Sequence, residues 1–310
     1  MEERKLIRLG NSSFAIALPK EWVTKSKLNK GDKVFLERNG NGEIIVSPEF
    51  KKSGNNKEIT IDVKGKEEEE IAREVISAYI CGNKKIIFKG EKREIKTVKN
   101  VSKKFLNLEL IDEKEGFAIF EDLLDLEQID IKNFIKRIDN NIKEMFEILS
   151  EILNSEKNQK KRIKELYEID EDITKFYFLI WRFMRIGIDN PSIQSSLKIS
   201  PNSFFDYFWV SYNIEQIGDE IKTIAKKINK ENRECVKNIF SIIVENYHKL
   251  MKSFFENKKN FSKEIILEKE KMIERFNKLS DIQSSGAIVE KFQQININIH
   301  NVAKMVFYEF

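Results

Sequence analysis

The chain has 310 residues, of which 41% are hydrophobic and 34% are charged, so it is long enough for two or three domains with their own cores. Its 55 basic and 51 acidic residues leave a net charge of +4, which excludes a globally basic nucleic-acid-binding protein and confines any such role to a local patch. Only 12 Gly and 4 Pro occur, which favours long helices over a many-turned β fold.

The chain also lacks the marks of a secreted, zinc-binding or membrane protein. Cys81 and Cys235 are far apart in sequence and are expected to be reduced thiols. Two histidines are too few for a zinc site without cysteine ligands. The charged N-terminus has no signal-peptide core, and no apolar run approaches the length of a membrane span. We therefore expect a cytoplasmic protein without membrane insertion.

Residues 1–48 are predicted to form short strands with tight turns. Alternation of apolar and polar residues indicates strands, and Asn39-Gly40-Asn41-Gly42 is a strong hairpin turn. Apolar residues at helical spacing before the stop at Gly31 indicate one short helix. The expected elements are strands over 5–9, 14–18, 33–38 and 43–47 and a helix over 20–28.

Residues 49–57 are polar and without periodicity, which is typical of a linker. Residues 58–127 then alternate between strand and helix patterns in the order βαβαββ, which describes a small α/β unit. The expected strands cover 58–63, 84–88, 106–111 and 116–120, and the expected helices cover 66–80 and 91–105.

From Ile129 onward the apolar periodicity is helical to the end of the chain. Short breaks between long amphipathic segments favour antiparallel packing, and six helices divide naturally into two bundles of three. The expected helices cover 130–154, 160–187, 202–228, 231–257, 262–281 and 284–309.

The first 48 residues carry an ordered set of motifs. A basic strand is followed by Gly-x-Ser, by an apolar strand that ends in Leu-Pro, by a short helix and by Leu-x-x-Gly-Asp-x-Val, which ends at Val34. This set resembles the SpoVT/AbrB-type swapped-hairpin domain, in which two chains interleave their hairpins into one barrel. Some 45 residues with one short helix also cannot bury enough apolar surface alone. The resemblance therefore implies a homodimer formed through this domain.

The same segment has a local excess of positive charge, with nine basic residues among the first 38 against five acidic ones. The SpoVT/AbrB family contacts DNA through the basic strand and the loop after it. By position, the resemblance implicates Arg4, Lys5, Arg8, Asn11 and Ser12 in DNA binding. The alternative is that these basic residues only keep the surface of a dimerisation domain soluble and do not bind DNA.

The helical part resembles PhoU, the helical regulator of phosphate uptake. The stretch from Tyr167 to Leu179 resembles the acidic helix of that family, and the stretch from Asn213 to Ile221 contains its Glu-x-x-x-Asp motif. A swapped-hairpin domain followed by a PhoU domain resembles an archaeal class of phosphate-uptake regulators.

Glu215 and Asp219 are four residues apart and should lie on one face of a helix. With Asp170 from a neighbouring helix they could hold one divalent or ferric metal ion through oxygen ligands, as many PhoU proteins do. The chain departs from the family where Thr174 replaces a second carboxylate and where residues 293–304 carry amides in place of acids. Because of these amides, the metal site of the second bundle is expected to be lost. The alternative for the remaining three carboxylates is a solvated acidic face.

The predicted fold class is therefore multi-domain α+β. It comprises a dimeric N-terminal swapped-hairpin β-barrel (1–48), a small central α/β unit (58–127) and a C-terminal all-α PhoU-like pair of three-helix bundles (129–310). A Gly-rich phosphate loop, a nucleophile–His pair and a zinc motif are all missing from the sequence, which argues against an enzyme.

Two functions remain at this point. The first is a DNA-binding transcriptional regulator that responds to phosphate status. The second is an adaptor that dimerises through its N-terminal domain and negatively regulates a phosphate transporter or its sensor kinase without binding DNA.

Overall fold

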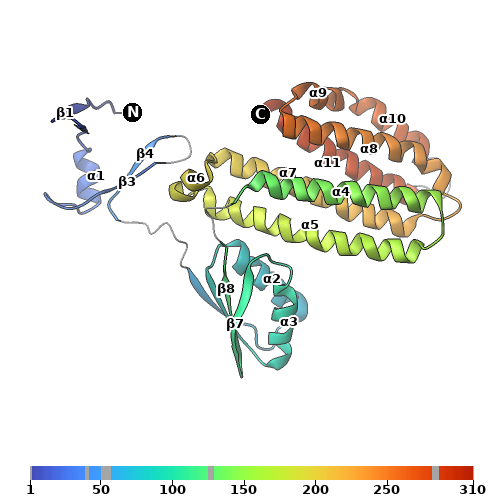
Figure 1. The fold of residues 1–310 in the computed structure, drawn as a ribbon, viewed down its shortest axis with the longest axis horizontal. Coiled ribbons are helices and arrows are strands. Elements are labelled where there is room, and N and C mark those ends of the chain that lie inside the picture. Colours follow the sequence, from blue (N-terminus) through green and yellow to red (C-terminus); the bar gives the residue numbers. More distant parts are fainter. Residues whose placement is uncertain (1, 39–41, 50–56, 125–128, 281–285, 310) are drawn as a thin grey trace.

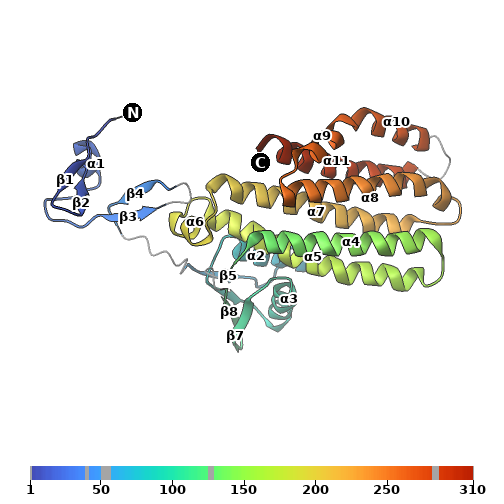
Figure 2. The same ribbon diagram turned by 45° about the horizontal axis from the view of Figure 1, so that its top comes forward.

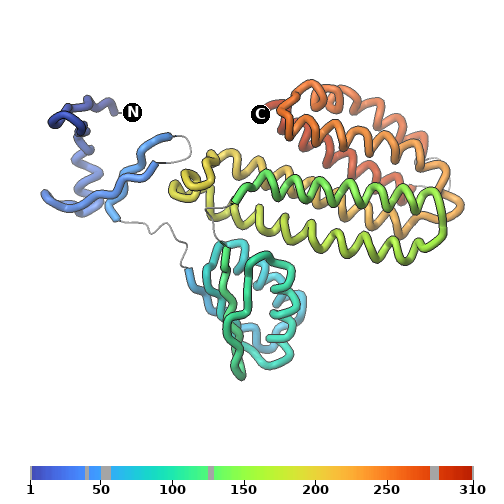
Figure 3. Tube along the Cα trace, viewed as in Figure 1, coloured from blue at the N-terminus to red at the C-terminus, as the bar shows by residue number. Residues whose placement is uncertain are grey.

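The computed structural model of the chain describes residues 2–38, 42–49, 57–124, 129–280 and 286–309. Three parts follow one another along the chain: an N-terminal unit, an α/β domain and a large helical domain (Figures 1 and 3). Most of the predicted hairpin turn at 39–42 and of the predicted linker at 49–57 lies outside the described residues, as does the predicted break before the last helix.

The N-terminal unit consists of two separate hairpins and one helix. Strand β1 (Ile7–Leu9) pairs antiparallel with β2 (Ser13–Ala15), and β3 (Phe35–Arg38) pairs antiparallel with β4 (Ile44–Ser47). Helix α1 (Lys20–Lys25) lies between the hairpins and is shorter than predicted. The described residues of one chain thus form two two-stranded sheets and no closed barrel. The barrel of the predicted fold would require strands from a second chain.

The central domain has the predicted βαβαββ order. Strand β5 (Glu58–Asp62) pairs parallel with β6 (Lys85–Lys89), and β6 pairs antiparallel with β8 (Phe117–Asp122). Strand β7 (Leu108–Lys114) occupies the edge beside β8, so the sheet order is β5-β6-β8-β7.

Helices α2 (Glu68–Ile80) and α3 (Lys92–Ser102) pack against each other and provide the helical layer of this domain (Figure 1). Their apolar faces and the sheet form one core. Its fully buried members include Val75, Tyr79, Ile86, Phe88 and Val98.

The helical domain begins with α4 (Ile131–Asn154), whose apolar residues recur every three or four positions, as in Ile135, Ile138 and Ile142. The Asp130 side chain caps this helix by accepting a hydrogen bond from the backbone N–H of Lys132 at 2.9 Å.

Helices α4, α5 (Gln159–Gly187) and α7 (Pro201–Lys227) pack together along their length. The other half contains α8 (Arg233–Glu256), α9 (Lys259–Leu267), α10 (Lys269–Ser280) and α11 (Gly286–Glu309). Helices α7 and α11 pack against each other (Figure 2). A single hydrophobic core runs through both halves. None of the helices in the described ranges is both long and apolar enough to cross a membrane.

Two features of the helical domain differ from the prediction. Helix α6 (Pro191–Leu197) lies in a segment predicted to be a loop, where the Asn190 side chain caps its first turn and Pro191 occupies its first position. The single helix predicted over 262–281 is divided into α9 and α10 at Glu268, and no residue there marks the break in the sequence.

A buried arginine joins the α/β domain to the helical domain. Arg182 of α5 donates to Oδ2 of Asp122 at 2.6 Å and to the backbone oxygen of Asn83 at 3.2 Å, and it also donates to the backbone oxygen of Tyr79. Its guanidinium carbon lies 4.8 Å from the centre of the Tyr79 ring. Both charged side chains of the pair are less than a tenth exposed.

Aromatic packing surrounds this buried ion pair. Phe178 and Trp181 of α5 pack against the core of the α/β domain, and the rings of Phe178 and Phe105 lie 5.3 Å apart. The α/β domain and α5 are therefore held together by both apolar packing and a buried ion pair. Helices α2 and α5 are in contact at this junction (Figure 2).

Replacing Arg182 by Met should lower the free energy of unfolding by about 3–5 kcal/mol, because the Asp122 carboxylate would stay buried without its partner. Urea denaturation followed by circular dichroism measures this change. The double variant Arg182→Met/Asp122→Leu is the control and should recover most of the loss, since no charge then remains buried. If the free energy of unfolding falls by less than about 1 kcal/mol in Arg182→Met, the Arg182–Asp122 pair is not a buried, stabilising contact.

Candidate functional site

The residues predicted to contact DNA lie at or just before the β1–β2 hairpin, and all are exposed. Arg8 is in β1, opposite Phe14 of β2, and its Nε donates to the backbone oxygen of Gly10 at 3.2 Å. Asn11 and Ser12 form the turn, which Gly10 enters with a φ of +68°. The hairpin thus brings three of the five predicted residues to one tip.

The other two predicted residues, Arg4 and Lys5, lie in the segment that leads into β1. Arg4 forms an exposed ion pair with Glu2 at 2.6 Å, which is a weak interaction in water. Lys5 is exposed. These basic side chains are free to meet phosphate groups at little energetic cost.

The N-terminal unit also exposes an unusual amount of apolar surface. Leu6, Phe14 and Leu36 are 71%, 67% and 67% exposed, and no residue of α1 is buried. Further large apolar side chains on this unit are exposed, namely Ile7, Leu9, Ile16, Val34, Ile44 and Ile45. Hairpins with apolar side chains and unpaired edges are surfaces that another chain can complete.

The second predicted site is an acidic cluster between α5 and α7. Asp170 lies on α5, and Glu215 and Asp219 lie one turn apart on α7. The Lys222 ammonium lies between two of these carboxylates, 2.5 Å from Oδ2 of Asp170 and 2.7 Å from Oδ1 of Asp219. The second oxygen of Asp170 is buried and has no hydrogen-bond partner among the described residues.

Burial controls the electrostatics of this cluster. It raises the pKa of Glu215 to about 7, with a further contribution from the Asp219 carboxylate and an opposing hydrogen bond from Gln216. It also raises the pKa of Asp170, against the attraction of Lys222. Burial would lower the pKa of Lys222, but the hydrogen bonds to Asp170 and Asp219 outweigh it and raise that pKa.

As placed, these residues do not fit a resident metal ion. Nowhere in the described parts of the chain do three or more His, Cys, Asp or Glu side chains come close enough to hold one. Lys222 instead supplies the positive charge between Asp170 and Asp219. Metal binding through Asp170, Glu215 and Asp219 therefore stays a prediction, and it requires Lys222 to move away.

Sequence reasoning missed Lys222 and Arg182 for different reasons. Lys222 follows Asp219 by three residues and Glu215 by seven, so the helical spacing already places it on the same face. Arg182 has its carboxylate partner 60 residues away in sequence, and no local pattern indicates that pairing.

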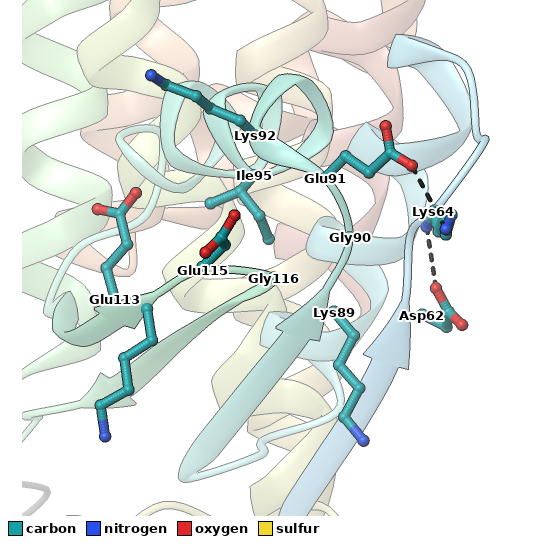
Figure 4. A pocket seen from close by; sticks show the side chains of 11 residues that line it. Asp62, Lys64, Lys89, Gly90, Glu91, Lys92, Ile95, Glu113, Glu115 and Gly116 are labelled. Atoms are coloured by element: carbon teal, nitrogen blue, oxygen red, sulfur yellow. Dashed lines mark hydrogen bonds and ion pairs between the residues drawn. The ribbon is translucent and has the colours of Figure 1, made fainter.

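A pocket lies in the α/β domain, where the parallel strands β5 and β6 end. It has a volume of about 770 Å³ and opens beside the first turn of α3 (Figure 4). Charges of both signs line it, for example Lys89 and Glu115, and Lys64 pairs with Glu91 at 3.4 Å. Because the signs are mixed, the lining does not select one class of ligand.

Comparison with known families gives two matches. Residues 7–56 match the family described as antidote-toxin recognition MazE, bacterial antitoxin, and residues 135–228 match the PhoU domain. The first match includes Arg8, Asn11 and Ser12, and the second includes Asp170, Glu215 and Asp219. The chain matches no curated protein and no solved structure.

Both matched families are regulatory and non-enzymatic. The predicted resemblance is confirmed: an N-terminal segment of the MazE/AbrB type and a PhoU-type segment occur in one chain.

Glu215→Gln should make the protein more stable at pH 8 and leave it nearly unchanged at pH 4.5. A carboxyl whose pKa is raised by folding binds its proton more tightly in the folded state, so stability falls as pH rises from about 4.5 to 7. The variant should remove this loss, which is about 3 kcal/mol for a rise in pKa from 4.5 to about 7. Urea denaturation in the presence of a chelator measures it, with Glu144→Gln on the exposed side of α4 as the control. Equal free energies of unfolding for Glu215→Gln and Glu144→Gln at pH 8 would contradict the prediction.

Proposed function

We propose that the protein is a DNA-binding transcriptional regulator of phosphate uptake and phosphate homeostasis that acts as a homodimer. One observation is the main support for the proposal: the same chain contains a MazE/AbrB-type domain with an exposed basic hairpin and a PhoU domain. The N-terminal domain would bind DNA, and the PhoU domain would sense the signal or dock a partner. The proposal places the protein in the cytoplasm.

The basic and apolar surfaces of the N-terminal unit support two parts of this proposal. Pairing with a second copy would cover Phe14 and Leu36, which one chain leaves exposed. The same pairing would present Arg8 and its neighbours twice, which doubles the number of phosphate contacts available to one dimer.

Leu36→Glu should shift the full chain from dimer to monomer, because a charge would be buried in the proposed interface. Analytical ultracentrifugation at several protein concentrations measures the shift. Leu267→Glu is the matched control, since Leu267 is 70% exposed on the helical domain. A wild-type chain that is monomeric at all concentrations would refute the homodimer.

Arg8→Ala should weaken DNA binding and flatten its salt dependence. Each lost phosphate contact lowers the slope of log affinity against log salt by about 0.9, so the dimer should lose up to about 1.8. Fluorescence-anisotropy titrations across several salt concentrations measure the slope.

Lys230→Ala serves as the control for this titration, because the Lys230 side chain is 82% exposed on the helical domain. Wild-type binding too weak to measure at low salt, on both random and selected DNA, would rule out the regulator and favour the second function.

The second function is an adaptor that dimerises through the N-terminal unit and negatively regulates a phosphate transporter or its sensor kinase. The matched N-terminal family is described as antidote-toxin recognition MazE, bacterial antitoxin, which does not name DNA and favours this second function. The exposed apolar side chains would then serve pairing alone. Chromatin immunoprecipitation of the intact protein separates the two functions, because only the regulator should enrich discrete DNA sites.

The proposal includes one optional cofactor, a divalent or ferric ion at Asp170, Glu215 and Asp219. Lys222 opposes it, so Lys222→Gln should take up more metal than the wild type, and Asp219→Asn should take up less. Elemental analysis after metal loading and gel filtration measures both. Equal, negligible metal in all three proteins would leave the acidic cluster as an ion-pair network.

A further inference from the structure

A cavity of about 360 Å³ lies between α10 and α11, in the half of the helical domain away from the acidic cluster. It is lined on one side by Lys269 and Phe276 of α10 and on the other by Ile297, His300 and Lys304 of α11. Its size falls near the lower end of the range of about 300–1,000 Å³ that is typical of small-molecule sites.

The charge in this cavity has one sign. None of its described lining residues is acidic, and the two lysines contribute two positive charges. Neither ammonium forms an ion pair with any described residue, whereas the Lys222 ammonium is held by two carboxylates. Amides such as Asn296 stand in the helix where acids were expected from the family resemblance, so the lining offers hydrogen bonds without negative charge.

A buried histidine at the cavity lacks a partner. His300 is only 7% exposed, and its Nε2 has no hydrogen-bond partner among the described residues. Burial lowers the pKa of His300, and Lys304 and Lys269 lower it further, so both ammonium groups act on the imidazole. A buried polar atom without a partner is unfavourable, and an acceptor on a ligand would satisfy an Nε2–H donor.

We infer that this cavity binds a small organic phosphate. Lys269, Lys304 and the Nε2–H of His300 would hold the phosphate oxygens through charge-assisted hydrogen bonds. The apolar part of the ligand would lie on Phe276 and Ile297. This inference is independent of DNA binding and of the metal, since none of its residues belongs to either site.

The binding experiment uses the full chain and isothermal titration calorimetry at fixed ionic strength. Phenyl phosphate carries both halves of the proposed ligand, inorganic phosphate carries the anion alone, and phenol carries the apolar part alone. We expect phenyl phosphate to bind most tightly and phenol most weakly. If neither phenyl phosphate nor inorganic phosphate binds, the inference is overturned. If the two bind with equal affinity, the assignment of an organic phosphate is overturned.

Two variants of α10 locate the binding. Lys269→Gln should weaken phenyl phosphate binding about tenfold, because one charged hydrogen-bond donor is lost. Lys271→Gln removes the same charge from an exposed position of the same helix that does not line the cavity, and it should change the affinity less than twofold. Both positions are exposed, so the fold should survive both changes. Equal losses in the two variants, or no loss in Lys269→Gln, would place the binding elsewhere and overturn the inference.

Discussion

The arrangement of the two larger domains depends on the buried pair between Arg182 and Asp122. Withdrawing a charged pair from water is costly, and hydrogen bonds to the pair offset part of that cost; the two terminal nitrogens of Arg182 donate to Asp122 and to two backbone oxygens of the α/β domain. Asp170 lies twelve residues earlier on the same helix, about 18 Å away along its axis. A shift of α5 at the acidic cluster would therefore also move the α/β domain.

The two halves of the helical domain have opposite electrostatic character. In the half formed by α4, α5 and α7, Asp170 and Asp219 hold the ammonium group of Lys222, and burial raises the pKa of Glu215 to about 7. In the other half, two lysines and His300 line a cavity to which no described residue contributes a carboxylate. In the first half a lysine already balances the acidic side chains, whereas the lysines of the second half have no described carboxylate partner, although a single apolar core runs through both halves.

Much of this architecture could be predicted from local patterns. The recurrence of Ile135, Ile138 and Ile142 predicts α4, and the strand–helix alternation predicts the order of the α/β domain. Local patterns fail where the partner is distant in sequence, as for Arg182, or where a lysine beside acids is indistinguishable from an ordinary surface charge, as for Lys222. The exposure of Phe14 and Leu36 could be anticipated only in part, because it depends on how little core one chain can build.

The uncovered apolar side chains of the N-terminal unit have a consequence for the amount of protein in the cell. If two units complete each other as proposed, the folded state of this domain is favoured by mass action, and its population rises with the concentration of the chain. A dilute chain would keep a folded PhoU domain, whose core is internal, while its N-terminal unit lost order. DNA binding by the N-terminal domain would then begin only above a certain concentration of the chain, without any ligand.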